Sequence, residues 1–300
     1  MGVNKLQVWC PVCDSKDCKV LYEPWVSIQE PQKLYGAASG IQGTQRLVMC
    51  NACHMIYENP RYPDEVILAG YTGAEESGHD SQYGSRVKSF YRTLKSLVDA
   101  IPQRGSRVLD VGTAGGAFLD AATRYGYDAV GLEPSRYLVE QGRKRGLNIE
   151  QGTIDTNPLK PGSFDLVCLW DVIEHLTDPK GALSKIRTLL KPDGVLLINF
   201  PDIGTWQAKL AGQRFWWILS VHLHHFTRKT IAEICRRTGF ETFRFQRYWQ
   251  TLEFGYLQQM AIHYKIPLSR PLKRLTPEAI QRLPIPYYAS QTTALARLSD

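Results

Sequence analysis

The sequence predicts an α/β fold built on a doubly wound, mostly parallel β-sheet, with a small cysteine-rich lobe before it. Three observations lead to this prediction. Strand-like and helical patterns alternate from about residue 105 to 250, as they do where helices cover both faces of a parallel sheet. A glycine-rich turn follows the first of these strands. Two C-x-x-C pairs lie within the first 60 residues.

Length and composition limit the possibilities. The chain has 300 residues, of which 43% are hydrophobic, so it can bury a large core and hold more than one domain. No apolar run reaches the ~18 residues that a membrane span requires. The first residues carry no apolar segment of the signal-peptide type, so we expect a cytoplasmic, reducing location, where clustered cysteines are more often metal ligands than disulfides. The net charge of +7 fits an anionic partner, but mere solubility would also explain it.

The cysteine pairs "CPVC" and "CNAC" predict a small zinc ribbon. Each pair places two thiolates on one side of a tight turn, and two such turns complete a tetrahedral zinc site. Four thiolate ligands leave no open coordination position, so this zinc would be structural. Cys18 or His54 could replace one ligand, and the pairs could also be turns without metal. The expected ligands are Cys10, Cys13, Cys50 and Cys53.

The strands of the main domain are expected where short apolar runs lie between turn residues. These runs are "RVLDVG" (107–112), "DAVGLEP" (128–134), "FDLVCLW" (164–170), "VLLINFP" (195–201), "ETFRFQRYW" (241–249) and "QTTALARL" (291–298).

The helices between them are recognised by apolar spacings of three and four and by their caps. Ser135 and Thr227 are expected N-caps, and Gly194 and Gly239 are expected to end helices. The expected helices are 86–101, 115–126, 135–146, 179–194 and 227–239. The resulting domain prediction is a ribbon over 1–60, a helical linker or lid over 61–104, a main domain over 105–251 plus 291–300, and an inserted helical lid over 252–290.

The glycine turn "DVGTAGGAF" predicts a ligand other than a dinucleotide. The spacing of its glycines does not match G-x-G-x-x-G, the pattern that lets a backbone approach a pyrophosphate. Asp110, just before the turn, suits a ligand with an amino group. Glu133, at the end of the next strand, can accept hydrogen bonds from both hydroxyls of a ribose. A nicotinamide-dependent dehydrogenase is therefore disfavoured.

These segments together resemble the class I S-adenosylmethionine-dependent methyltransferases. The resemblance rests on "DVGTAGGAFL", "GLEP", "GSFDLVCLWDVIEHLTDP" and "LLKPDGVLLINFP", and it covers roughly residues 85–250. It implies a Rossmann-like, seven-stranded sheet and S-adenosylmethionine as cofactor. Ala114 departs from the family, which usually has glycine at this position.

The resemblance also implies which residues surround the cofactor. The methionine part would lie against Asp110, Gly112, Ala114 and Gly116, and the ribose against Glu133. The adenine would lie along Thr153, Ile154 and Asp155, which follow the third strand. Trp170 and Asp171, after the fourth strand, would lie beside the donor.

Three histidines crowd the segment "SVHLHHFT", and a fourth stands in "IEHL". In zinc-bearing C-methyltransferases of deoxysugar synthesis, which this chain resembles, a histidine before a Phe-Ser/Thr pair acts as base, and His222 matches it. We therefore expect His222 to be a general base, because an imidazole can take a proton at neutral pH. His224 is a second candidate or a substrate contact, and in an extended segment it would face the same way as His222, with His225 opposite. His175, with Glu174 as its neighbour, is expected to have a structural or substrate-positioning role. Satisfied polar side chains or metal ligands remain alternative interpretations.

The predicted function is methyl transfer from S-adenosylmethionine to a hydroxyl or carbon of a small-molecule intermediate, such as a sugar or an anionic nucleotide sugar. An RNA or protein methyltransferase is an alternative. Nucleic acid is disfavoured as a partner, because the Asn/Asp-Pro-Pro-aromatic motif of amino-directed enzymes is missing where "LWDVIEHL" stands. A non-catalytic protein that binds S-adenosylmethionine is a third hypothesis.

Overall fold

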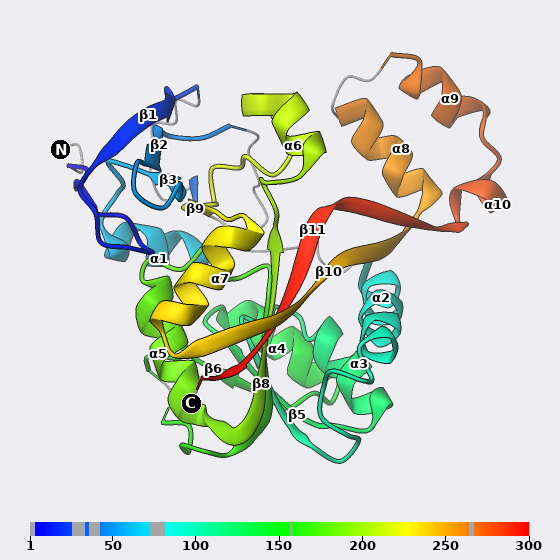
Figure 1. Cartoon of the computed structure of the whole chain (residues 1–300). Coiled ribbons are helices and arrows are strands. Elements are labelled where there is room, and N and C mark those ends of the chain that lie inside the picture. The colour runs from blue at the N-terminus through cyan, green and yellow to red at the C-terminus, as the bar shows by residue number, and fades with distance from the viewer. Residues whose placement is uncertain are drawn as a thin grey trace.

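A computed structural model describes residues 4–25, 34–35, 43–72, 82–156, 158–263 and 267–299, and the predicted ranges that reach beyond them are considered only within these limits. The centre of the molecule is a seven-stranded sheet with the strand order β10-β11-β8-β7-β4-β5-β6 (Figure 1). Its strands are β4 (Arg107–Val111), β5 (Asp128–Glu133), β6 (Ile149–Gln151), β7 (Phe164–Trp170), β8 (Leu190–Pro201), β10 (Phe240–Glu253) and β11 (Pro284–Leu298).

The five strands from β4 to β8 are parallel, and β11 is antiparallel to both of its neighbours. The sheet is therefore mostly parallel, and the predicted Rossmann-like fold class is confirmed. In the centre, Asp110 of β4 stands opposite Gly131 of β5 and Cys168 of β7. The carboxyl ends of β4, β5 and β7 thus lie side by side, which is where such folds bind ligands.

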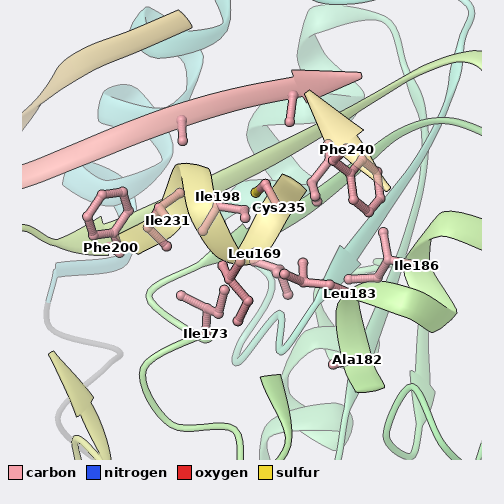
Figure 2. Close-up of a cluster of buried hydrophobic side chains, with 14 of the residues drawn as sticks. Leu169, Ile173, Ala182, Leu183, Ile186, Ile198, Phe200, Ile231, Cys235 and Phe240 are labelled. Carbon is pink, nitrogen blue, oxygen red and sulfur yellow. The ribbon is translucent and has the colours of Figure 1, made fainter. Parts of the chain in front are cut away.

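Helices cover both faces of the sheet, because side chains alternate along each buried strand. On one face, Leu169 and Ile198 pack against α5 (Pro179–Leu189) and α7 (Arg228–Arg237), as Figure 2 shows. On the other face, Cys168 and Leu197 pack against α2 (Tyr83–Ser96), α3 (Ala117–Tyr125) and α4 (Arg136–Lys144). The burial of these apolar side chains between sheet and helices is the main source of the stability of the fold.

Most of the expected caps are formed. The Ser135 hydroxyl accepts from the Leu138 N–H, and Thr227 forms a capping box with Thr230. One expectation was wrong: α5 ends at Leu189 and not at Gly194. Leu190 already has extended geometry and pairs with Phe164 of β7. Pro192 explains the early end, because proline cannot continue a helix and disfavours helical geometry in the residue before it.

The N-terminal lobe is a second, four-stranded sheet with the order β1-β2-β3-β9. Its first three strands are β1 (Cys18–Tyr22), β2 (Leu47–Cys50) and β3 (Ile56–Glu58), and α1 (Asp64–Thr72) follows them. The fourth strand, β9 (His224–His225), comes from the segment before α7, far from the other three in sequence, and pairs with Ile56 and Tyr57. Figure 1 shows β9 beside β3, above α7. The histidine segment is therefore part of the lobe that carries the cysteine pairs.

The predicted insertion consists of three helices that extend away from the sheet on the long β10–β11 hairpin (Figure 1). They are α8 (Phe254–His263), α9 (Ser269–Leu275) and α10 (Glu278–Gln281). β10 and β11 both run into the range predicted for the insertion, since they reach Glu253 and begin at Pro284. A short helix α6 (Trp206–Ala211) and a 3-10 turn (Gly212–Arg214) follow β8. Within the described ranges, every helix is too short or too polar to cross a bilayer.

Candidate active site

The glycine turn lies between β4 and α3, and its backbone conformation explains its composition. Gly112 and Gly116 have φ values of 71° and 85°. A Cβ atom on Gly112 would lie 2.7 Å from Val172 Cγ2, so the turn touches the segment after β7 directly. Ala114 has a φ of 50°, the left-handed region that costs an L-residue about 1–2 kcal/mol. The alanine thus keeps the conformation that glycine would have at this position.

Two buried carboxylates flank this turn. Asp110, at the end of β4, is 1% exposed, and its Oδ1 has no hydrogen-bond partner among the described residues. Burial raises the pKa of Asp110 to about 8. Glu133, at the end of β5, holds the turn in place: its Oε2 accepts from the Ala114 N–H and its Oε1 from the Ser135 N–H, both at 2.9 Å. One oxygen of Asp110 therefore lacks a protein donor in the described structure, and Glu133 shapes the loop.

Trp170, the last residue of β7, and Asp171, the residue after it, differ in their surroundings. Trp170 packs in the core, with its ring centroid 4.9 Å from that of Phe90 and 5.3 Å from that of Phe118. Asp171 has a φ of 55° and accepts hydrogen bonds from Asn199 Nδ2 (2.8 Å) and Gln291 Nε2 (2.5 Å). Burial raises the pKa of Asp171 to about 6, against the opposing charge of Arg86. Trp170 thus points into the core, whereas Asp171 stands at the carboxyl edge of the sheet.

The segment predicted to border the adenine forms a turn after β6. The Thr153 N–H donates to Thr156 Oγ1 at 2.9 Å, which closes the turn. The Ile154 side chain is buried in the core beneath it. Asp155 is exposed, and its carboxylate lies 3.6 Å from Lys185 Nζ. Of the three predicted residues, Thr153 and Asp155 therefore present their side chains at the surface of this turn.

The histidines do not alternate as an extended segment would. His222 lies in a turn before β9, and its ring contacts those of His225 and His175, with centroids 6.2 Å and 4.8 Å away. His224 points elsewhere: its Nε2 lies 2.9 Å from the Leu176 carbonyl oxygen. The expectation that His222 and His224 face one way was wrong, because strand alternation does not extend to a residue in a turn.

Both rings in the closest histidine pair are oriented by backbone carbonyls. His222 Nδ1 lies 2.8 Å from the Trp217 oxygen, and His175 Nδ1 lies 2.9 Å from the Val221 oxygen. A carbonyl can only accept, so His222 Nδ1 carries the proton and His222 Nε2 carries the lone pair. Burial lowers the pKa of His222 well below its ordinary value, which keeps the ring neutral. Tyr71 of α1 also hydrogen-bonds to His175 Nδ1.

Glu174 completes this cluster, and the prediction treated it only as a neighbour of His175. It is 1% exposed, and neither carboxylate oxygen has a hydrogen-bond partner in the described part of the chain. Glu174, His175 and His222 each offer one possible ligand atom, and these three atoms lie within 4.8 Å of one another. The Glu174 carbonyl also accepts from the His224 N–H at 3.1 Å, which ties the two segments together. We refer to Glu174, His175 and His222 as the Glu-His cluster.

The cluster lies next to the predicted donor site. Burial raises the pKa of the Glu174 carboxyl well above its ordinary value, and the negative charge of Asp171 raises it further. Val172, between them in sequence, contacts Gly112 of the turn. The structure thus places the His222 ring against His175 in the segment that follows β7, whereas His224 hydrogen-bonds to backbone carbonyls of that segment. The role of Tyr71 could not be read from sequence, because 104 residues separate it from His175.

The four predicted zinc ligands lie together in the N-terminal lobe. Their sulfur atoms are all within 4.8 Å of one another, with Cys10 Sγ and Cys53 Sγ 3.4 Å apart. This arrangement fits a tetrahedral Cys₄ site, where sulfur–metal distances are about 2.3 Å. Cys18 lies outside this set, in β1 opposite Cys50.

Comparisons with known proteins agree with this geometry. Residues 83–243, more than half of the chain, match a family model described as a methyltransferase domain. The chain belongs to this family, the class I S-adenosylmethionine-dependent methyltransferases.

Similar proteins include an uncharacterized 37.1 kDa protein in a Streptomyces fradiae transposon, 36% identical over 39% of this chain and 35% of that protein. Ubiquinone biosynthesis O-methyltransferases are similar too. The one from Xanthomonas campestris is 33% identical over 32% of this chain and 43% of its own length. The one from Xylella fastidiosa is 27% identical over 50% of this chain and 64% of its own length. The chain therefore spans less than two thirds of each of these relatives.

Solved structures show the same fold. A methyltransferase from Archaeoglobus fulgidus aligns with a TM-score of 0.51 and 16% identity over 74% of this chain and 99% of its own. A methyltransferase from Thermotoga maritima aligns with a TM-score of 0.50 and 20% identity over 73% and 93%.

Proposed function

We propose that the protein transfers a methyl group from S-adenosylmethionine to a hydroxyl or carbon of a small-molecule intermediate, such as a sugar or nucleotide sugar. The observation that carries the proposal is the placement of the buried Asp110 and Glu133 on either side of the glycine turn, with the imidazoles of His175 and His222 one segment away. Asp110 Oδ1 is buried without a donor, and an ammonium group of the ligand would supply one. A carboxylate at the end of β5, as Glu133 has, suits the ribose hydroxyls, because it can accept hydrogen bonds from them.

The reaction itself needs alignment more than acid catalysis, because the sulfonium is already an activated donor. The acceptor attacks the methyl carbon, the carbon–sulfur bond breaks, and neutral S-adenosylhomocysteine leaves. A hydroxyl or acidic C–H must also lose a proton. We propose His222 as the acceptor of that proton, since the Trp217 carbonyl holds its Nδ1 as donor and leaves Nε2 unprotonated.

Several observations support a small acceptor. Trp217 stacks on His222 with centroids 6.2 Å apart, which gives the cluster an aromatic neighbour. The ubiquinone-pathway relatives are O-methyltransferases by name, which supports a hydroxyl acceptor. The net charge of +7 is compatible with an anionic one. We also propose that the four cysteines hold a structural zinc ion, which would fix the lobe that contains β9.

Calorimetry with S-adenosylmethionine and S-adenosylhomocysteine tests the donor, and methyl transfer to a panel of sugars and nucleotide sugars tests the acceptor. His222→Ala should lower turnover by ~10² or more and leave donor affinity within a few-fold. His224→Ala is the matched comparison, because that ring is equally buried but bonded to the Leu176 carbonyl. Equal turnover in both variants would remove His222 from the mechanism. Absence of donor binding would remove the function as a whole.

A further inference from the structure

The Glu174 carboxylate is the most unusual polar group in the described structure. It is 1% exposed, and both of its oxygens lack hydrogen-bond partners there. An isolated carboxylate in such surroundings is strongly unfavourable, so it needs a proton or a cation beside it. The side chain lies beside two histidines, and among the described residues no lysine or arginine is hydrogen-bonded to it. A carboxyl group that only filled space in the core would not require histidine side chains beside it.

The two histidines are prepared to act as ligands. The Trp217 carbonyl holds His222 with Nδ1 as the donor at 2.8 Å, and the Val221 carbonyl and the Tyr71 hydroxyl both hold His175 at its Nδ1. Metal-binding histidines commonly have this arrangement, in which a backbone carbonyl or carboxylate holds the second ring nitrogen and orients the lone pair of the first.

We propose that Glu174, His175 and His222 bind a divalent cation that also holds the oxygen atoms of the acceptor. Their ligand atoms lie within 4.8 Å of one another. Small side-chain rotations would bring all three to about 2.0–2.2 Å from a common centre. Two imidazoles and one carboxylate form a ligand set that first-row divalent metals accept, and three protein ligands leave positions open for an acceptor.

The cation would define the class of acceptor. Two adjacent oxygens, as in a vicinal diol or a hydroxy-carbonyl, can occupy two open positions and be held in a fixed orientation toward the donor methyl. A bound cation also makes a coordinated hydroxyl more acidic, as it does with water. The proton then passes to water, the oxygen attacks the methyl carbon, and the carbon–sulfur bond breaks.

The role that this inference gives the cation in catalysis rests on the proposed function. The inference also changes the role proposed for His222. In the cation-bound protein the Nε2 lone pair of His222 is used for coordination, so the imidazole positions the cation instead of removing the proton. The two roles are alternatives for one nitrogen atom, and metal binding decides between them.

Titration of the full-length, zinc-loaded protein with Mn²⁺, followed by the loss of the free-ion paramagnetic resonance signal, tests the site. Manganese prefers oxygen and nitrogen ligands, whereas the cysteine site prefers soft metals, so the two sites are distinguished. We expect one Mn²⁺ per chain. Glu174→Gln should weaken binding by ~100-fold or more. It should also raise the melting temperature of the metal-free protein, since it removes a buried carboxylate without a partner. The control His224→Gln should bind Mn²⁺ as the wild type does.

Three outcomes would overturn the inference: no Mn²⁺ bound at millimolar concentration, equal binding by Glu174→Gln, or full methyl transfer in protein freed of Mn²⁺ by a chelator. The third leaves the proposed function and the base role of His222 intact. Donor binding is measured by calorimetry on the same samples. A protein that binds Mn²⁺ but ignores S-adenosylmethionine would contradict the proposed function and leave the metal site standing.

Discussion

At the scale of single residues, the site is made of polar groups that the fold buries before any ligand arrives. Asp110 and Glu174 are both 1% exposed and both have carboxylate oxygens without a partner in the described structure. Such groups reduce the stability of the free protein, because burial disfavours the charged form. Residues that a fold retains at this cost are candidates for function, since the ligand supplies what the protein lacks.

Asp110 gives a pH-dependent prediction. Its ordinary pKa of 3.8 rises to about 8 in the folded protein. The folded state therefore holds a proton that the unfolded state has lost, and the stability of the ligand-free protein should fall as the pH rises from about 4 to about 8. Asp110→Asn removes this dependence, and it should raise the free energy of unfolding at pH 8 by at least about 1 kcal/mol. Urea unfolding at several pH values measures this.

The same variant should bind S-adenosylmethionine at least about tenfold more weakly, because the ammonium group loses its carboxylate. In the wild type, donor affinity should increase between about pH 6 and pH 7, as more Asp110 ionises while the ligand α-amino group stays protonated. Unchanged affinity in Asp110→Asn, measured by calorimetry, would show that the donor amino group binds elsewhere.

At the scale of elements, the short strand β9 decides where the histidines lie. It pairs with β3 on one side, and Phe226 anchors its end: this side chain is 1% exposed and its ring contacts Phe200 of β8. The Phe226 carbonyl also accepts from the Ile203 N–H at 3.0 Å. The position of His222 therefore depends on how well Phe226 packs.

Truncation of this anchor should be costly. Phe226→Ala should lower the free energy of unfolding by about 3–5 kcal/mol, as loss of a fully buried aromatic ring does. Phe226→Leu keeps most of the volume and should cost less than about 1.5 kcal/mol. Guanidinium denaturation of the two variants gives both values. A cost below about 1 kcal/mol for Phe226→Ala would mean that backbone pairing alone fixes β9.

Elements with local signals could be predicted from the sequence. The buried strands are continuous apolar runs, and Ser135 and Thr227 cap helices through contacts three residues away. The pairing of His224 with Tyr57 could not be predicted, because a two-residue strand has no pattern and its partner is remote. The Glu-His cluster was only partly found for the same reason. Its histidines stood out in the sequence, but only the fold reveals that Glu174 has no hydrogen-bond partner in the described structure.

At the scale of the whole molecule, the cysteine lobe and the main domain share one core. Cys10, Val12 and Met55 belong to the same buried cluster as Leu169 and Ile198 of the sheet. An ion pair between Lys180 of α5 and Asp14 also joins the two parts at the surface. The predicted boundary between the ribbon and the main domain follows the sequence pattern. Among the described residues, however, buried side chains pack continuously across this boundary.

Loss of zinc should therefore affect the acceptor side of the site and spare the donor side. Cys53→Ser should lose zinc, lower methyl transfer at least about tenfold, and leave S-adenosylmethionine affinity within a few-fold, because Asp110 and Glu133 stand on the large sheet. Colorimetric zinc analysis and calorimetry measure the first and last effects. Cys18→Ser is the control and should keep its zinc. Retained zinc and full activity in Cys53→Ser would contradict the proposed ligand set.

The pairing of Ile56 with His225 joins positions that are far apart in the chain. The sheet of the N-terminal lobe is therefore incomplete until β9, which lies within the main domain in sequence, pairs with β3. Grafting residues 1–60 alone onto another methyltransferase would transplant three strands without their fourth, and the recipient would have to supply its own histidine-bearing edge. A recombination experiment would therefore have to transfer both of these distant segments together.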